Sequence, residues 1–318
     1  MTASGSTAPQ FYPGAAPRRT AGGFVNAMTV DVEDYFQVQA FEQRIPRSAW
    51  NEIPRRVEAN VDRLLELFLT NAVSATFFVL GWIAERHPDM IRRIAAGGHE
   101  LASHGYDHTR VDRLSPADFR EDVRRTKGTI EAIAGRAVNG YRAPTFSIGS
   151  HTEWAYDILE DEAYLYSSSI YPIRHDLYGA PDAPRIPFRP GRGKLWEFPL
   201  TTRRVLGVNL PCAGGGYFRL LPYWTSRRSL RYINAADSAP CIFYFHPWEI
   251  DIAQPRVQGV STRTRVRHYT NIRSMPLRLS RLVRDFQWAS MEQVFADRIF
   301  SPDATPSPPD CESRVWAS

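Results

Sequence analysis

Residues 99–108, HELASHGYDH, form an apolar, strand-like segment that ends in two histidines four positions apart. Neutral imidazole is a common zinc ligand, so His104 and His108 at this spacing can meet one ion. A hydrolytic zinc site has about three protein ligands and leaves a position open for water. The pair therefore predicts a metal centre at the end of a strand, completed by a ligand from elsewhere in the chain.

A second strand end, residues 29–36, supplies carboxylates. It follows the apolar stretch 24–30 and contains Asp31, Glu33 and Asp34, more acids than one zinc ion needs. A spare carboxylate beside a metal ion stays ionised and can act as a general base toward water. The two strand ends together indicate a hydrolytic metal site.

Further segments each place a reactive or anchoring residue after an apolar run: 138–146 (VNGYRAPTF), 194–199 (KLWEFP) and 241–249 (CIFYFHPWE). In their order along the chain, these segments and the two strand ends resemble the five motifs of the polysaccharide deacetylases, carbohydrate esterase family 4. The resemblance covers roughly residues 24–249. The conjunction of motifs is far more specific than any one of them.

The resemblance implies a role for each reactive residue. Asp31 is the catalytic base, Arg142 orients that base, and His246 is the general acid. His104 and His108 are metal ligands. The implied cofactor is a divalent metal, with Zn²⁺ expected and Co²⁺ or Ni²⁺ as alternatives.

The first motif departs from the common family pattern, Thr-Phe-Asp-Asp-Gly, whose second Asp binds metal. Here Asp31 is followed by Val32, Glu33 and Asp34. Glu33 is the first choice of metal ligand, because it lies two residues after Asp31 and faces the same side of an extended strand. Asp34 is the alternative ligand if the chain has already turned.

Residues beside these motifs are expected to contact the sugar. Trp196 is expected to wall the acetyl pocket. Tyr35, Pro144 and Trp248 complete the expected substrate-binding set. A backbone N–H near Tyr35 is the expected donor to the oxyanion that forms during hydrolysis.

Helical and strand patterns alternate along the chain. The expected elements are a helix over 55–71, a buried strand over 74–80, a helix over 88–96 that ends at Gly97-Gly98, and a helix that starts at Ser115-Pro116. Such alternation predicts an α/β fold with a parallel sheet and its chemistry at the strand ends. The resemblance implies a distorted (β/α)7 barrel of the polysaccharide deacetylase type.

One principal domain is expected for 318 residues with 43% hydrophobic composition. The predicted organisation is a disordered tail (1–23), the barrel (24–250), a C-terminal extension that completes the domain (251–300), with a helix near 276–286, and a second disordered tail (301–318). Long loops over the barrel mouth are expected at 174–193 and 211–223.

Composition also excludes several classes of protein. No apolar window approaches the roughly 18 residues that span a bilayer, and the N-terminal region lacks the apolar core of a signal peptide, so the expected location is the cytoplasm. Cys212, Cys241 and Cys311 are widely separated, which argues against a disulfide framework. A formal charge of +5 is modest, and without a recognition module no nucleic acid partner is expected.

The combined expectation is a metal-dependent hydrolase that removes N-acetyl groups from amino sugars of a bacterial exopolysaccharide or of its lipid-linked precursor. Three segments resemble the deacetylase branch encoded with exosortase (PEP-CTERM) loci: Asp-Val-Glu-Asp-Tyr-Phe at 31–36, His-Pro-Trp-Glu at 246–249 and Arg-His-Tyr at 267–269. This closer resemblance implies association with exopolysaccharide assembly machinery. Two alternatives stay open: a small cyclic-amide amidohydrolase of the same barrel family, and a glycan-binding protein without turnover, which the altered first motif favours.

Overall fold

A curved parallel sheet organises the chain, as seen in a computed structural model that describes residues 23–176, 178–190 and 193–301. Its strands are β1 (Val25–Val32), β2 (Thr76–Val79), β3 (Glu100–Ser103), β4 (Gly140–Tyr141), β5 (Tyr166–Ser167), β6 (Trp196–Glu197), β9 (Ile242–Phe245) and β10 (Gln287–Ala289). The hydrogen-bonded order is β10-β1-β2-β3-β4-β5-β6, and β9 also pairs with β1. The predicted α/β class with a parallel sheet is confirmed.

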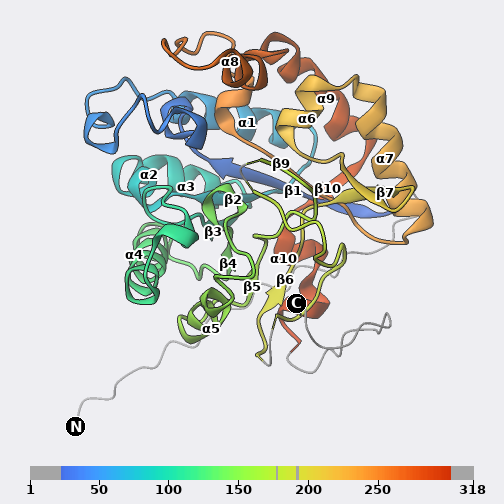
Figure 1. The fold of residues 1–318 in the computed structure, drawn as a ribbon, viewed down its shortest axis with the longest axis horizontal. Coiled ribbons are helices and arrows are strands. Elements are labelled where there is room, and N and C mark those ends of the chain that lie inside the picture. Colours follow the sequence, from blue (N-terminus) through green and yellow to red (C-terminus); the bar gives the residue numbers. More distant parts are fainter. Residues whose placement is uncertain (1–22, 177, 191–192, 302–318) are drawn as a thin grey trace.

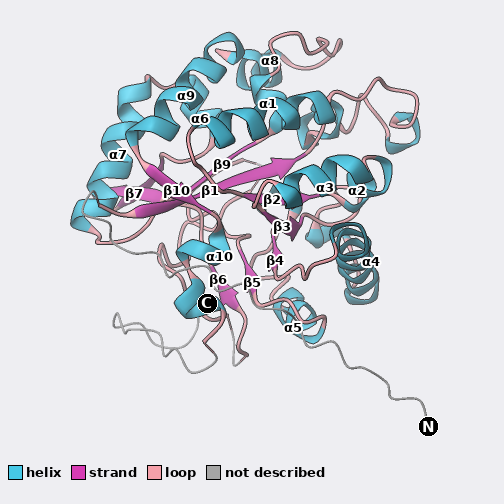
Figure 2. Cartoon of the chain, turned by 180° about the vertical axis from the view of Figure 1, so that it is seen from behind, coloured by secondary structure: helices cyan, strands magenta, loops and turns pink. Residues whose placement is uncertain are grey.

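Helices lie around the outside of this half-barrel (Figure 1 and Figure 2). They are α1 (Val57–Thr70), α2 (Gly81–Arg86), α3 (Pro88–Ala96), α4 (Pro116–Ala134), α5 (Trp154–Asp161), α6 (Gly215–Leu220), α7 (Tyr223–Ala236), α8 (Thr262–Tyr269), α9 (Met275–Asp285), α10 (Met291–Val294) and α11 (Ala296–Ile299). Helices α2 and α3 follow β2, and α4 follows β3. These helices cover the outer face of the sheet and leave its other face toward the interior of the barrel.

Local sequence signals account for several of these elements. The helices expected over 55–71 and 88–96 and the strand expected over 74–80 are confirmed as α1, α3 and β2. Ser115 caps α4, its hydroxyl accepting the backbone N–H of Asp118 at 3.2 Å. At the other end, Gly135 adopts the left-handed conformation that closes a helix.

One of the two expected loops needs correction. The loop expected over 211–223 is wrong, because these residues end a strand, form α6 and begin α7. The preceding residues form an antiparallel hairpin of β7 (Thr202–Val205) and β8 (Val208–Pro211). Its turn places Leu206 and Gly207 at positive φ, without the Asn-Gly pair that signals such a turn in a sequence. The other expected loop, 174–193, contains no helix or strand in its described residues.

Side chains alternate along β1, so that one face of this strand points into the barrel, toward the site. Met28 and Val30 pack in the large core cluster with the surrounding helices, whereas Ala27 packs in a second cluster inside the barrel. Thr29 and Asp31 share the inward face with Ala27, since side chains alternate along a strand. The barrel interior therefore carries the polar residues of β1 toward its carboxyl end.

The sheet does not close by strand pairing between β6 and β9. Instead, the Thr201 hydroxyl accepts the backbone N–H of Ile242 at 2.7 Å, and Gly214 forms an isolated bridge with Tyr244. Seven strands thus correspond to the expected barrel, and β10 adds an eighth from the C-terminal extension. That extension also places Met291 in the interior cluster.

The expected tails fall outside the described residues, apart from Gly23 and Ser301. Cys212 and Cys241 are buried free thiols, and Cys311 lies outside the described part of the chain. None of the helices in the described residues is long and apolar enough to cross a membrane.

Candidate active site

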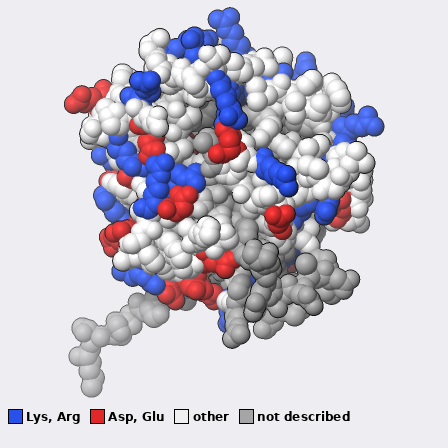
Figure 3. Space-filling view, in the orientation of Figure 1, with Lys and Arg blue, Asp and Glu red and all other residues white. Residues whose placement is uncertain are grey.

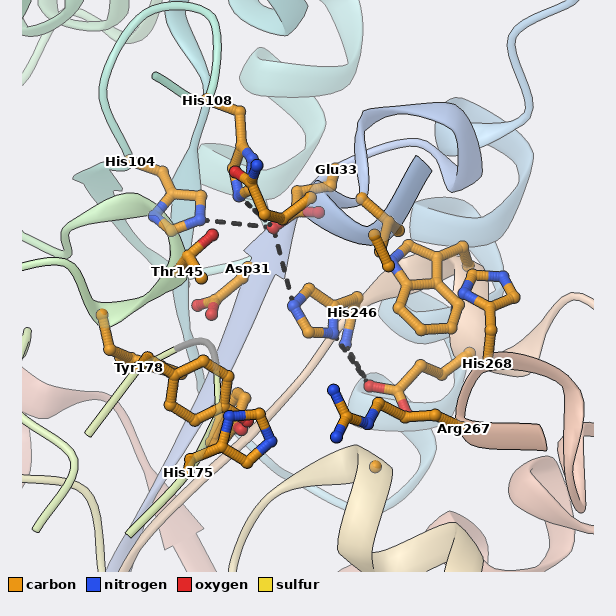
Figure 4. A pocket seen from close by; sticks show the side chains of 18 of the residues that line it. Asp31, Glu33, His104, His108, Thr145, His175, Tyr178, His246, Arg267 and His268 are labelled. Carbon is orange, nitrogen blue, oxygen red and sulfur yellow. Dashed lines mark hydrogen bonds and ion pairs between the residues drawn. The ribbon is translucent and has the colours of Figure 1, made fainter. Parts of the chain in front are cut away.

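The predicted reactive residues meet at the carboxyl ends of neighbouring strands (Figure 4). Asp31 and Glu33 come from the end of β1, His104 follows β3 directly, and His246 follows β9. Parallel strands present these ends on the same side of a sheet, which is where α/β barrels place their chemistry. The five residues Asp31, Glu33, His104, His108 and His246 all line one cavity of about 160 Å³.

Glu33, His104 and His108 form a group whose ligand atoms lie within 4.8 Å of one another. The Glu33 Oε1 atom is 3.4 Å from His104 Nε2 and 3.0 Å from His108 Nε2, and all three side chains are buried. The Nδ1 of His104 donates to the backbone carbonyl of Arg142 at 2.8 Å, which turns its Nε2 toward Glu33. Two imidazoles and one carboxylate so arranged are a ligand set that suits a divalent metal.

Asp34 lies outside this group because its carboxylate is used by the backbone. One oxygen accepts the N–H of Tyr35 at 2.8 Å, and the other accepts the N–H groups of Arg56 and Val57 at 2.6 and 3.0 Å. Asp34 thus ties the end of β1 to the start of α1. Of the two carboxylates considered as metal ligands, the structure places Glu33 with the histidines and Asp34 away from them.

Arg142 holds Asp31 in place through hydrogen bonds. Its Nη1 donates to Asp31 Oδ1 at 2.6 Å and to the Thr29 hydroxyl at 2.8 Å, while Nε and Nη2 bind the carbonyl and hydroxyl of Ser168 at 3.0 Å each. The guanidinium lies 4.1 Å from the ring centre of Phe78. A buried ion pair is held in one geometry when its remaining donors are also bonded, as they are here.

His246 is oriented by an acid that sequence reasoning missed. Its Nδ1 lies 2.9 Å from Glu249 Oε1, and Arg219 Nε donates to Glu249 Oε2 at 2.7 Å. Burial lowers the pKa of His246, but Glu33 and Glu249 outweigh it and raise that pKa to about 9. Burial raises the pKa of Glu249, but Arg219 and His246 lower it to about 2. The available signal was the Glu three residues after His246 in His-Pro-Trp-Glu.

Helix α8 of the C-terminal extension supplies part of the cavity wall (Figure 4). Thr264, Arg267 and His268 line the cavity, and His268 stacks on Trp248 at 4.2 Å between ring centres. Trp248, an expected substrate-binding residue, lines the cavity and also stacks on His246. Arg267 and His268 are adjacent in the segment 267–269 that carried the closer resemblance, yet no role was predicted for either.

Trp196 lies elsewhere than predicted. It is buried in the interior cluster, with Arg189 and Arg298 at 4.9 and 5.4 Å from its ring, and is absent from the residues that line the cavity. The reason is its place on β6: its side chain faces the packed interior, whereas the next residue, Glu197, accepts the backbone N–H groups of Ser169 and Ile170. Trp196 therefore stabilises the barrel interior and does not wall the site.

Tyr35 and Pro144 also lie outside the cavity lining. Tyr35 is buried against Phe36. Its backbone N–H, one candidate for the oxyanion donor expected near this residue, donates to Asp34 instead. Pro144 is buried and its carbonyl accepts the Ser147 hydroxyl at 2.7 Å. Both residues shape the loops that carry the site.

Thr145 is a cavity residue with an unusual backbone. It has φ 55° and the following Phe146 has φ 48°, a left-handed pair without glycine. Such strain is found mostly where a site requires it. The Thr145 Oγ1 atom is buried without a hydrogen-bond partner among the described residues, and Figure 4 shows it beside His104 and Asp31. The sequence Ala-Pro-Thr-Phe carries no local signal for this conformation.

Comparisons with known families agree with this geometry. Residues 48–161 match the family described as "Polysaccharide deacetylase", and residues 168–296 match the one described as "Domain of unknown function (DUF3473)". The chain therefore contains a polysaccharide deacetylase region. His104, His108 and Arg142 lie in the first match, whereas His246, Glu249 and α8 lie in the second.

Relatives with known names cover part of the chain. A chitooligosaccharide deacetylase of Bradyrhizobium sp. (strain ANU 289) is 30% identical over 100 residues, which span 31% of this chain and 43% of the relative. A peptidoglycan-N-acetylglucosamine deacetylase of Bacillus cereus is 31% identical over 94 residues, 29% of this chain and 34% of the relative. The chain thus spans less than half the length of these relatives.

The fold as a whole resembles a solved structure from Mycobacterium smegmatis, provisionally assigned as a polysaccharide deacetylase. The two superpose with a TM-score of 0.56 at 20% identity, over 93% of this chain and 99% of the other. The likeness covers both family regions and shows that they form one fold in that protein also.

Proposed function

We propose that the protein is a metal-dependent deacetylase that removes N-acetyl groups from amino sugars of a bacterial polysaccharide or of its lipid-linked precursor. The observation that carries the proposal is one cavity in which Glu33, His104 and His108 converge between two further groups. On one side lies Asp31, held by Arg142, and on the other lies His246, held by Glu249. An acid and a base around a metal-ligand group suit amide hydrolysis.

Glu33, His104 and His108 are the residues that would hold the metal. A divalent ion bound there supplies Lewis acidity, which polarises a carbonyl and makes water easier to deprotonate. Asp31 would accept the proton of the attacking water, while Arg142 holds this carboxylate in place through a charge-assisted hydrogen bond. His246 would protonate the amine as it leaves, because an amine is a poor leaving group without a proton.

Thr145 supplies the donor that Tyr35 cannot. Its hydroxyl is buried, lines the cavity and has no partner among the described residues, so it can donate to the carbonyl oxygen as negative charge develops there. The strained backbone at Thr145 and Phe146 supports this role, since it directs a short side chain at the reacting atoms.

The finer parts of the proposal stay predictions: an exopolysaccharide substrate, the exosortase branch with its assembly machinery, zinc as the ion, and a cytoplasmic location. The alternatives are a small cyclic amide as substrate and glycan binding without turnover. The match to the polysaccharide deacetylase family supports an N-acetylated glycan, and the pairing of Asp31 and His246 with charged partners supports turnover.

The test is acetate release from N-acetylated glycans by the purified chain, with metal content measured in parallel and a chelated sample beside it. Chelator-sensitive release that collapses in Asp31→Asn, while glycan binding persists in that variant, is the expected result. Binding without release at any divalent metal would instead establish a glycan-binding protein. Release from cyclic amides alone would establish the amidohydrolase.

A further inference from the structure

The outer wall of the cavity carries positive charge that is only partly neutralised. Arg267 reaches into the cavity from α8, on the side away from His104 and His108 (Figure 4). Its Nη2 donates to Asp176 Oδ1 at 3.0 Å, and Arg263 Nη2 lies 3.0 Å from the other oxygen of the same carboxylate. Two guanidinium groups therefore share one carboxylate, which leaves one positive charge in excess.

No other carboxylate of the cavity neutralises this excess. The acids that line the described cavity are Asp31, Glu33 and Glu249, and each is already bonded to a cation or an imidazole. Asp176, which binds both arginines, does not line the cavity. Figure 3 shows basic side chains at the top of the molecule, over the region of α8.

Arg267 also has hydrogen-bonding capacity to spare. A guanidinium carries about five N–H donors in a rigid fork that matches a carboxylate or a phosphate. Among the described residues, the Arg267 guanidinium donates one hydrogen bond, from Nη2 to Asp176. Because about a third of the Arg267 side chain is exposed, the remaining donors are accessible from the cavity.

We propose that Arg267, supported by Arg263, binds an anionic group on a sugar residue next to the N-acetylated one, so that the natural substrate is an acidic glycan. The inference rests on the proposed deacetylase function and adds the substrate class to it. The anionic group is an oxyanion, either the carboxylate of a uronic acid or a phosphate ester. A guanidinium binds either one bidentately.

The experiment compares acetate release from three oligosaccharides of equal length. One alternates N-acetylglucosamine with glucuronate, one contains N-acetylglucosamine alone, and one contains N-acetylglucosamine with a terminal phosphate. The wild type is expected to favour an acidic substrate by about tenfold or more in kcat/KM at low salt, with the preference lost as salt rises. The first and third arms distinguish the carboxylate from the phosphate.

Matched variants separate recognition from structure. Arg267→Gln is expected to lower the acidic-over-neutral ratio about tenfold, mainly through KM. Arg265→Gln removes the same charge from an exposed position of α8 outside the cavity and is expected to keep the ratio. Asp176→Asn frees both arginines and is expected to keep or raise the ratio, whereas a purely structural ion pair would make this variant resemble Arg267→Gln.

A wild-type ratio near one, or equal losses in Arg267→Gln and Asp176→Asn, would overturn the inference while leaving the deacetylase function intact. If no substrate releases acetate, the proposed function fails and binding decides the inference. Calorimetric affinity for the same oligosaccharides is then compared between the wild type and Arg267→Gln. Acid-selective binding that depends on Arg267 supports the inference, and equal or absent binding overturns it.

Discussion

Arg142 contacts the expected base and an expected metal ligand with different parts of one residue. Its backbone carbonyl accepts Nδ1 of His104 at 2.8 Å, and its guanidinium donates to Asp31 at 2.6 Å. The side chain and the main chain of Arg142 can therefore be tested separately, because a substitution alters the guanidinium and leaves the carbonyl in place.

Arg142→Lys should lower kcat by about a hundredfold, because a lysine cannot reproduce the forked contacts to Asp31, Thr29 and Ser168. Metal content should stay near that of the wild type, since the carbonyl that orients His104 is retained. Steady-state kinetics and metal analysis on the same preparation measure both quantities. Loss of metal in parallel with activity would show that the guanidinium acts on the metal site as well.

Glu33→Gln and Asp34→Asn should have different effects. Glu33→Gln removes the carboxylate from the group with His104 and His108 and should weaken metal binding by at least about tenfold. Asp34→Asn should keep metal binding but lower the free energy of unfolding by about 1–3 kcal/mol, because an amide N–H₂ then faces backbone N–H donors. Metal titration and urea unfolding of both variants measure these effects. Weaker metal binding in Asp34→Asn would contradict the choice of Glu33 over Asp34 as the metal ligand.

Thr145→Val keeps the branched shape at a strained position and removes the hydroxyl. Its kcat should fall about tenfold to a hundredfold with little change in KM, since the lost hydrogen bond is made as charge develops. Thr145→Ser retains the hydroxyl and should recover most of the activity. Equal activity of the Val variant and the wild type would remove Thr145 from the mechanism.

Glu100 should make stability depend on pH. Burial and the neighbouring Glu292 raise the pKa of Glu100 from 4.5 to about 8, against weaker opposing hydrogen bonds from Thr76 and Tyr166. A carboxyl with a raised folded-state pKa binds more protons when folded, so its contribution is fully present below pH 4.5 and is lost as the pH rises toward 8.

The expected slope for this one group is about 1.4 kcal/mol per pH unit within that window. Urea unfolding of the wild type and of Glu100→Gln, from about pH 5 to about pH 8, measures this slope. The Gln variant should lose this component, although Glu292, whose pKa is also raised, adds a dependence of its own. Parallel profiles for the two proteins would contradict the assignment to Glu100.

The sequence predicts the inner part of the site better than its outer wall. Asp31, His104 and His246 each follow an apolar run, and parallel strands bring their ends together, so a local pattern determined their place. Trp196 shows the limit of this reasoning, because β6 is two residues long and the direction of its side chains depends on packing, here of Trp196 against Phe198, which in turn packs on Phe295. A sequence motif identifies a residue but does not determine to which side of a short strand its side chain points.

The residues of α8 could not be placed from local pattern at all. Arg267 lies more than 200 positions after Asp31 in the sequence and reaches the same cavity only through tertiary packing. The buried partners of His246 are similar: Arg219 comes from α6, in a region expected to be a loop, and binds Glu249 across the interior. Long-range pairs of this kind leave no periodic trace in the sequence.

The segment after residue 250 contacts the barrel at both of its ends. At the mouth, α8 contributes Arg267 and His268 to the cavity; at the opposite end, β10 pairs with β1, and the backbone N–H of Met291 donates to Thr76 at 2.7 Å. The region that matches the deacetylase family is therefore smaller than the folded structure. A fragment cut to the matched deacetylase region, residues 48–161, would lose β1, β5, β6, β9 and β10 together with the α8 wall of the cavity, so engineering of this protein should keep residues 23–301 together.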